Sequence, residues 1–160
     1  MKLALGVIIG ALIVLGLILA FRGKISSTSS TISNTSGTSY ELDKRTADLG
    51  QMAVSDEKSA VFTLKNTDSQ SITLSDFNTS CNCTDAVVKI GDKTSPRFNM
   101  KMHMSATDAA WNSTLPPGAT AEIEIIYMPA KMPVYGPVSR YLDFVVGGKR
   151  EKLTITATVK

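Results

Sequence analysis

The segment TAEIEIIYM, residues 120–128, carries the clearest structural signal in the sequence. Apolar and polar side chains alternate along it, which is the period of a β-strand with one buried face. The buried face would consist of Ala121, Ile123, Ile125 and Tyr127. The segment therefore predicts a strand with one face buried in a hydrophobic core.

Further segments of strand character lie on both sides of this one. Gly147-Gly148 separates the last two and predicts a tight hairpin turn. No segment after residue 24 has the apolar stripe of an amphipathic helix. About seven short strands with turn residues between them predict an all-β fold, an immunoglobulin-like antiparallel β-sandwich. The expected strands are residues 46–53, 60–65, 71–77, 86–90, 120–128, 141–146 and 153–159.

Composition narrows the function. The 160 residues include 17 basic and 14 acidic side chains, a formal charge of +3 that is scattered along the chain. Because no basic cluster is interleaved with aromatic residues, we expect no nucleic-acid partner. We also find no Ser/His/Asp arrangement, no phosphate-binding glycine loop and no suitably placed pair of carboxylates. The sequence therefore predicts a protein that is not an enzyme.

The N-terminus reads as a membrane anchor. Residues 3–21, LALGVIIGALIVLGLILAF, are uncharged and long enough to span a bilayer as a helix. The end of this run lacks a small-x-small cleavage site, which favours an uncleaved signal anchor. Residues 25–39 are rich in Ser and Thr and predict a flexible linker. We expect an anchor at 1–24, a linker at 25–39 and a sandwich at 40–160 on the extracytoplasmic side of the cell membrane.

The chemistry of the chain is concentrated in two short stretches. They contain both cysteines, the single histidine and three of the seven methionines. Thiolate and thioether sulfur select Cu(I), and imidazole tolerates it. The sequence predicts a Cu(I) site for metal storage, transfer or tolerance, with a metal-donor or metal-acceptor protein as partner. Its ligands would be Cys81, Cys83, Met100, Met102, His103 and Met104, with Met128 and Met132 as weaker candidates.

Other interpretations of these residues stay open. Exported thiols usually oxidise, so Cys81 and Cys83 are also expected to form a disulfide or a redox-active pair. The very small ring closed by Cys-x-Cys should make such a bond reducible. Methionine also fills irregular gaps in cores, so the methionines could be packing residues. The domain could instead be a non-catalytic interaction module at the cell surface.

The cysteine stretch also carries a family resemblance. Ser80-Cys81-Asn82-Cys83-Thr84 matches a Ser-Cys-x-Cys-Thr signature, and Asp48-Leu49-Gly50 and Pro117-Gly118 match further landmarks. In this order the sequence resembles the bacterial Ig-like domain-of-unknown-function family 1573. The resemblance covers residues 48–159 and implies an exported Ig-like fold more than an activity.

A subgroup of that family has an insert of the form Ser-Pro-x-Phe-Gly-Met-His before a tryptophan. Residues 95–104, SPRFNMKMHM, and Trp111 are similar to it. Where the subgroup has an acid and a later histidine, this sequence has Met128 and Met132. The resemblance therefore implies a ligand set that has shifted toward sulfur.

Overall fold

The computed structural model describes residues 38–160. The predicted anchor and nearly all of the predicted linker lie outside this range. Within residues 38–160, no helix has the length and apolar character needed to cross a membrane.

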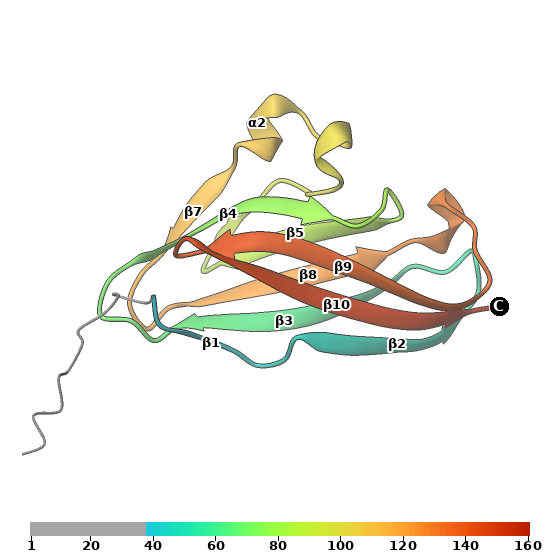
Figure 1. Cartoon of the computed structure of the whole chain (residues 1–160), viewed down its shortest axis with the longest axis horizontal. Helices are drawn as coiled ribbons and strands as arrows, with labels where there is room; N and C mark the ends of the chain where they lie inside the picture. Colours follow the sequence, from blue (N-terminus) through green and yellow to red (C-terminus); the bar gives the residue numbers. More distant parts are fainter. Residues whose placement is uncertain (1–37) are drawn as a thin grey trace, which may run out of the picture. The chain divides into compact units, whose positions relative to one another are not determined.

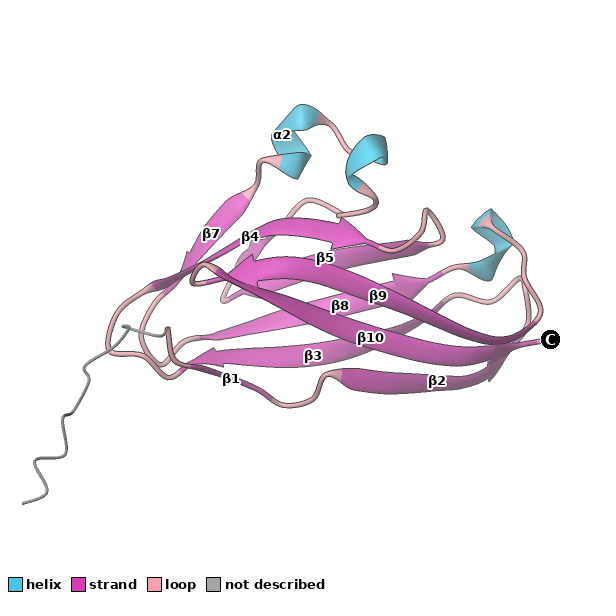
Figure 2. Cartoon of the chain, in the orientation of Figure 1, coloured by secondary structure: helices cyan, strands magenta, loops and turns pink. Residues whose placement is uncertain are grey.

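Two five-stranded sheets pack face to face (Figures 1 and 2). The first sheet has the order β1 (Tyr40–Leu42), β3 (Lys58–Asn66), β8 (Thr120–Tyr127), β5 (Thr84–Ile90) and β6 (Lys93–Thr94). The second has the order β2 (Thr46–Met52), β10 (Lys149–Val159), β9 (Gly136–Val146), β4 (Ile72–Thr79) and β7 (Asn112–Leu115). The described part of the chain is thus an all-β sandwich.

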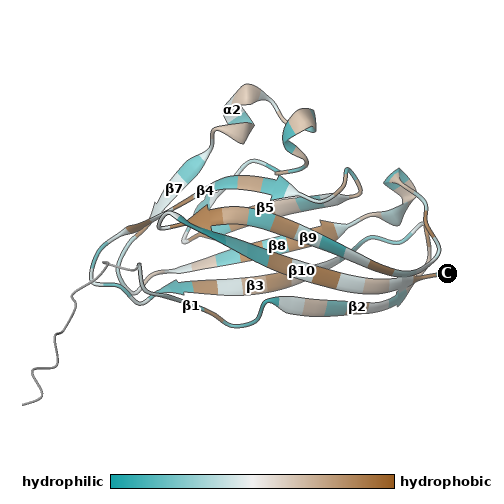
Figure 3. Cartoon of the chain, viewed as in Figure 1, coloured by the Kyte–Doolittle hydropathy of each residue, from teal (hydrophilic) through white to brown (hydrophobic). Residues whose placement is uncertain are grey.

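Strand β8 occupies the centre of the first sheet, as its alternation predicts. It pairs antiparallel with β3 and β5, and Ile123 lies opposite Phe62 on one side and Val88 on the other. The four side chains of the predicted buried face are fully enclosed. Figure 3 shows the same alternation of apolar and polar residues along β3, β9 and β10. The period-two pattern places a row of apolar side chains between the sheets, and their burial is the main stabilising term.

Aromatic rings fill one part of the core. Phe77 from β4 stacks on Phe98 at 4.5 Å and on Phe144 at 5.3 Å between ring centroids. Trp111 meets Phe77 edge-on at 5.6 Å and Phe98 at 5.3 Å. Phe98 and Trp111 lie on either side of residues 99–110, which include the Met/His part of the insert. This aromatic cluster therefore fixes both ends of that segment to the sandwich.

All seven predicted strands are present, and the Gly147-Gly148 turn joins β9 to β10 as predicted, with Val146 opposite Lys149. Both glycines have positive φ, +55° and +82°, which glycine adopts without strain. The short strands β1, β6 and β7 were not predicted from the sequence, because two to four residues are too few to show a period.

The sheets are not wholly antiparallel, which corrects the predicted fold class. Strand β2 pairs parallel with β10, with Ala47 opposite Ile155. Alternation alone indicates which side of a strand is buried and carries no information on the direction of its neighbour. The sandwich is therefore mixed, with ten strands rather than about seven.

A buried carboxylate ties the two sheets together near the β9–β10 turn. Glu151 of β10 is 7% exposed and accepts a hydrogen bond from the Tyr40 hydroxyl at 2.5 Å. Arg45 Nε lies 3.4 Å and Lys149 Nζ 3.2 Å from its oxygens. Burial opposes ionisation of Glu151, but the hydrogen bonds from Tyr40, Lys149 and Arg45 outweigh it and lower the pKa of this carboxyl group. Burial, followed by the bond to Glu151, raises the pKa of Tyr40.

Candidate functional site

The turn between β4 and β5 carries the two cysteines where the chain passes from the second sheet to the first. Cys81 and Cys83 form a disulfide bond. Cys83 is fully buried, whereas Cys81 is 8% exposed. The backbone carbonyl of Cys83 accepts a hydrogen bond from the Met128 N–H at 2.9 Å. The disulfide is therefore recessed in the end of the sandwich, with its Cys81 side nearer to solvent.

Two polar side chains contact the sulfur atoms. The Thr84 hydroxyl lies 3.3 Å from Cys81 Sγ and 3.9 Å from Cys83 Sγ. Arg140 of β9 directs its Nε–H at Cys83 Sγ over 3.4 Å. Since a disulfide sulfur is a weak acceptor, this guanidinium N–H has only a weak partner in the oxidised protein.

Arg140 is held in place by contacts on its other sides. Its NH1 group donates to the Ser139 carbonyl at 2.9 Å, and its central carbon lies 5.9 Å from the centroid of the Tyr127 ring. The Tyr127 side chain is fully buried, and its hydroxyl has no hydrogen-bond partner within the described residues. Unpaired buried polar groups are rare in folded proteins. The environment of the disulfide therefore contains a half-buried cation and an unpaired hydroxyl.

Asn99 joins the Met/His insert to the cysteine turn. Its Nδ2 group lies 3.3 Å from the Asn82 carbonyl and 3.2 Å from the Thr84 carbonyl, and it also contacts Asp85 Oδ1. The backbone carbonyl of Asn99 accepts a hydrogen bond from the Thr79 N–H at 3.3 Å. The structure therefore brings the two chemically distinctive stretches of the sequence side by side.

Asp85, two residues after Cys83, is a buried carboxylate beside the cysteine turn. It lies within β5, is 3% exposed and pairs with Arg97 NH1 at 3.1 Å and Lys131 Nζ at 3.2 Å. The insert brings Arg97 over this carboxylate, and the β8–β9 connection brings Lys131. Contacts between residues this far apart in the sequence cannot be predicted from a local pattern.

The methionines of the insert do not share one face, because residues 101–103 form the short helix η1 (Lys101–His103) rather than extended chain. Met102 is 77% exposed, His103 is exposed, and Met104 packs against the core. The adjacent helix α2 (Ala106–Ala109) completes the protruding insert, which lies beyond β4 in Figure 1.

The insert is fastened to β4 by charge. Lys101 contacts Asp76, which also accepts from Arg150 NH2 at 2.6 Å. The hydrogen bond from Lys101, together with that from Arg150, lowers the pKa of Asp76 against the opposing effect of burial. Asp76 has a φ of +61° at the point where the pairing of β4 with β9 shifts register.

The weaker candidate ligands lie in the connection after β8. Met128 is half-buried beside the cysteine turn, and Met132 follows the short helix η2 (Pro129–Lys131) and is 48% exposed. Within residues 38–160, no group of three or more His, Cys, Asp or Glu side chains is placed to hold a metal ion. In this oxidised state the cysteines offer no thiolate, and the charge of Arg140 faces Cys83. The Cu(I) site stays a prediction that requires a reduced pair.

Sequence reasoning missed Arg140 and the environment of Tyr127. A signal for Arg140 is present, because inward positions of β9 recur every second residue and Arg140 falls between Val138 and Leu142. A cation at an inward position of a strand indicates either a partner anion or a special role.

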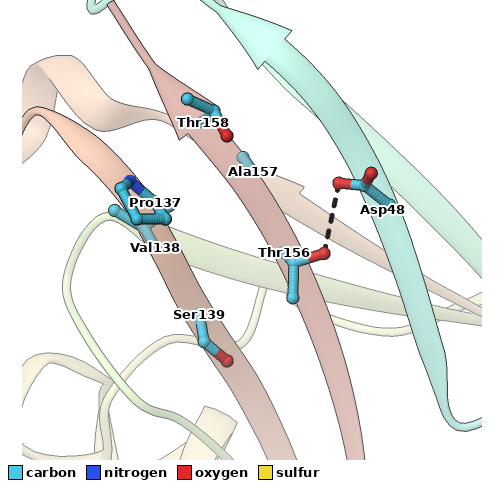
Figure 4. Close-up of a pocket in the computed structure, with 7 residues that line it drawn as sticks. All are labelled: Asp48, Pro137, Val138, Ser139, Thr156, Ala157 and Thr158. Carbon is cyan, nitrogen blue, oxygen red and sulfur yellow. Dashed lines mark hydrogen bonds between the residues drawn. The ribbon is translucent and has the colours of Figure 1, made fainter.

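A shallow hollow of about 460 Å³ lies on the outer face of the second sheet (Figure 4). Its lining residues come from β2, β9 and β10, and Thr156 donates to Asp48 at 3.1 Å across it. None of its lining side chains combines deep burial with charge, so the cysteine turn is the stronger candidate site.

The fold and the cysteine turn define a class of protein, the Ig-like β-sandwich with a Cys-x-Cys turn. The sequence model of the family described as "Protein of unknown function (DUF1573)" matches residues 40–107, which include this turn. The resemblance predicted from the Ser-Cys-x-Cys-Thr signature is thereby confirmed. No curated protein matches the chain.

Solved structures share the fold at low identity. A protein of unknown function from Porphyromonas gingivalis W83 is 15% identical with a TM-score of 0.55, over 76% of this chain and 46% of that one. The chain thus spans about half the length of that structure. PapD-like domain 7 of human CEP192 is 10% identical with a TM-score of 0.53, over 86% of this chain and 96% of that domain. These similarities support a PapD-like or Ig-like sandwich and nothing finer.

Proposed function

We propose that the domain is a non-catalytic, extracytoplasmic thiol–disulfide module that responds to redox conditions through Cys81 and Cys83. The observation that carries the proposal is the disulfide itself, set in a turn with Cys81 as the more exposed of the two cysteines and Arg140 against Cys83. A structural role is a weaker explanation, because a bond between residues two apart closes almost no chain and restrains the unfolded state little.

The test is a redox titration of the full-length chain. The protein is equilibrated with glutathione buffers of graded ratio, quenched with a maleimide, and weighed by mass spectrometry. We expect the two-thiol form to appear within the glutathione range, at a potential above about −300 mV, where reducible rather than structural disulfides lie. A pair that stays oxidised throughout, in a chain that stays folded by circular dichroism, would refute the proposal.

A second candidate is Cu(I) binding by the reduced pair together with the insert. The observation that favours it is the Asn99 bridge, which holds the residue just before Met100 against the cysteine turn. Reduced protein is titrated with Cu(I) against a competing chelator. We expect weaker binding in Cys81→Ser/Cys83→Ser and in a triple Met→Leu variant at 100, 102 and 104. Unchanged affinity in both variants would eliminate this site.

We further propose that residues 3–21 anchor the chain in the cell membrane, with the sandwich outside the cytoplasm. Their uncharged length supports this placement. Carbonate extraction and external protease digestion of intact cells check it. We expect the chain to resist extraction and the sandwich to be reached by protease, and a chain released by carbonate would contradict the anchor.

A further inference from the structure

We infer that an incoming thiolate attacks Cys81 and that Cys83 is the leaving sulfur, received by Arg140. This inference rests on the proposed function and assigns each sulfur a separate role. A disulfide has two possible points of attack, and the thiol that leaves more easily decides between them when both are accessible.

Access favours Cys81. Its residue is 8% exposed, whereas Cys83 is fully buried. Attack requires the thiolate to approach along the line of the S–S bond, from the side of the sulfur that it will join. Cys81 is the less enclosed of the two residues, so we place the attack of a thiolate from solvent there and not at Cys83.

Charge favours Cys83 as the leaving group. Arg140 Nε lies 3.4 Å from Cys83 Sγ, and the Ser139 carbonyl and the Tyr127 ring hold the guanidinium there. The guanidinium is always protonated in proteins, so it is ready to stabilise negative charge that develops on this sulfur. The weak oxidised contact becomes a charge-assisted hydrogen bond as the S–S bond breaks.

The step balances as a simple exchange. The thiolate RS⁻ forms a new S–S bond with Cys81, and the electron pair of the broken bond passes to Cys83 Sγ. Thr84 Oγ1, which lies close to both sulfurs, is a second donor for that thiolate. A second thiolate then attacks the mixed disulfide, which releases RSSR and leaves both cysteines reduced. The reductant is a thiol throughout, and two thiols are oxidised for each disulfide opened.

The experiment locates the first adduct. Oxidised full-length protein is mixed with reduced glutathione for short, graded times, and excess N-ethylmaleimide is then added to alkylate the remaining glutathione and capture the protein thiolate that has been released. Peptide mass spectrometry then reads the two positions. We expect glutathione on Cys81 and maleimide on Cys83, and the reverse pattern overturns the inference.

Arg140→Met tests the role of the guanidinium. Opening of the Cys81–Cys83 disulfide by glutathione should slow about tenfold, because one charge-assisted hydrogen bond to the leaving sulfur is lost. Arg140→Lys should recover part of the rate, which a purely structural role would not predict. Arg150→Met removes an arginine that pairs with Asp76 instead, and its rate should match the wild type. Equal rates in all four proteins would overturn the assignment of Arg140.

The adduct experiment distinguishes failure of the proposed redox function from failure of the assigned sulfur roles. If no adduct forms at any glutathione concentration while the protein stays folded, the proposed redox function fails with the inference. If adducts form on Cys83 first, the module is redox-active and only the assignment of the sulfurs is wrong.

Discussion

Two charged side chains lie on the inner face of the β9–β10 hairpin, and their surroundings differ. Glu151, near the Gly147-Gly148 turn, is surrounded by donors from Tyr40, Arg45 and Lys149. Arg140, farther along β9, meets a disulfide sulfur, one carbonyl and the face of a ring. No carboxylate of the described residues pairs with it in an ion pair.

The difference separates a structural charge from a functional one. A charge between two sheets is costly unless it is paired, so a fold that needs only stability supplies the partners, as it does for Glu151. Arg140 remains without an anion until the disulfide is opened. Under the proposed redox function, its partner is the thiolate that forms on Cys83 when the disulfide is reduced.

The largest expected change in the free energy of unfolding is at Glu151, the charge that the fold pairs with donors. Glu151→Ala should lower the free energy of unfolding by about 2 kcal/mol, because it removes the acceptor that joins Tyr40 to β10 and leaves space in the interior. Chemical denaturation measures the change. The matched control is Glu122→Ala, an exposed glutamate of β8, which should change stability by less than about 0.5 kcal/mol. Equal effects in both variants would remove the distinction drawn for Glu151.

The pH dependence sharpens the same comparison. The pKa of Glu151 is lowered in the folded protein, so the folded state gains stability above the ordinary glutamate pKa and loses it as pH falls through the lowered value. Asp43 and Asp76 also have lowered pKa values and titrate in this region. The stability difference between wild type and Glu151→Ala isolates Glu151, and denaturation at graded pH should show it narrowing in acid. A constant difference would contradict the network.

Removal of the disulfide should have a smaller effect. Cys81→Ala/Cys83→Ala should cost about 1.5 kcal/mol, the chain-entropy value for a loop of this very small size. Thermal or chemical unfolding of the oxidised wild type and the double variant provides the measurement. A loss several times larger would make the bond a structural staple and would weaken the contrast with Glu151.

The smallest expected change is at Arg140. In the oxidised protein, Arg140→Met should alter the free energy of unfolding by less than about 1 kcal/mol, because the charge has no strong partner to lose. Denaturation of the oxidised variant checks this. A loss as large as that of Glu151→Ala would show that Arg140 is a structural charge.

The sequence predicted the strands well where the pattern is local. Residues 120–128 and 153–159 correspond to β8 and β10, because the alternation of apolar and polar residues directly indicates a strand with one buried face. The parallel partner of β10 could not be predicted, since β2 lies about a hundred residues away and alternation carries no direction.

The site was predicted in part. The cysteine pair and the insert were singled out by their composition, and the structure places them together through Asn99. The arrangement of the methionines could not be predicted, because period-two spacing does not show whether residues 101–103 are extended or, as in the structure, form a short helix. Arg140 and Tyr127 come from β9 and β8, and their approach to Cys83 depends on how the two sheets stack, which no local pattern encodes.

The cysteine turn is restrained in two independent ways. Its covalent restraint is the disulfide, and its other restraints are the Cys83 carbonyl to Met128 and the Asn99 amide to the carbonyls of Asn82 and Thr84. None of these hydrogen bonds involves a sulfur atom, so opening the disulfide leaves all of them available. Under the proposed redox function, the β4–β5 turn would therefore keep its hydrogen bonds while the disulfide is open. It would return to the same closed geometry after each reoxidation.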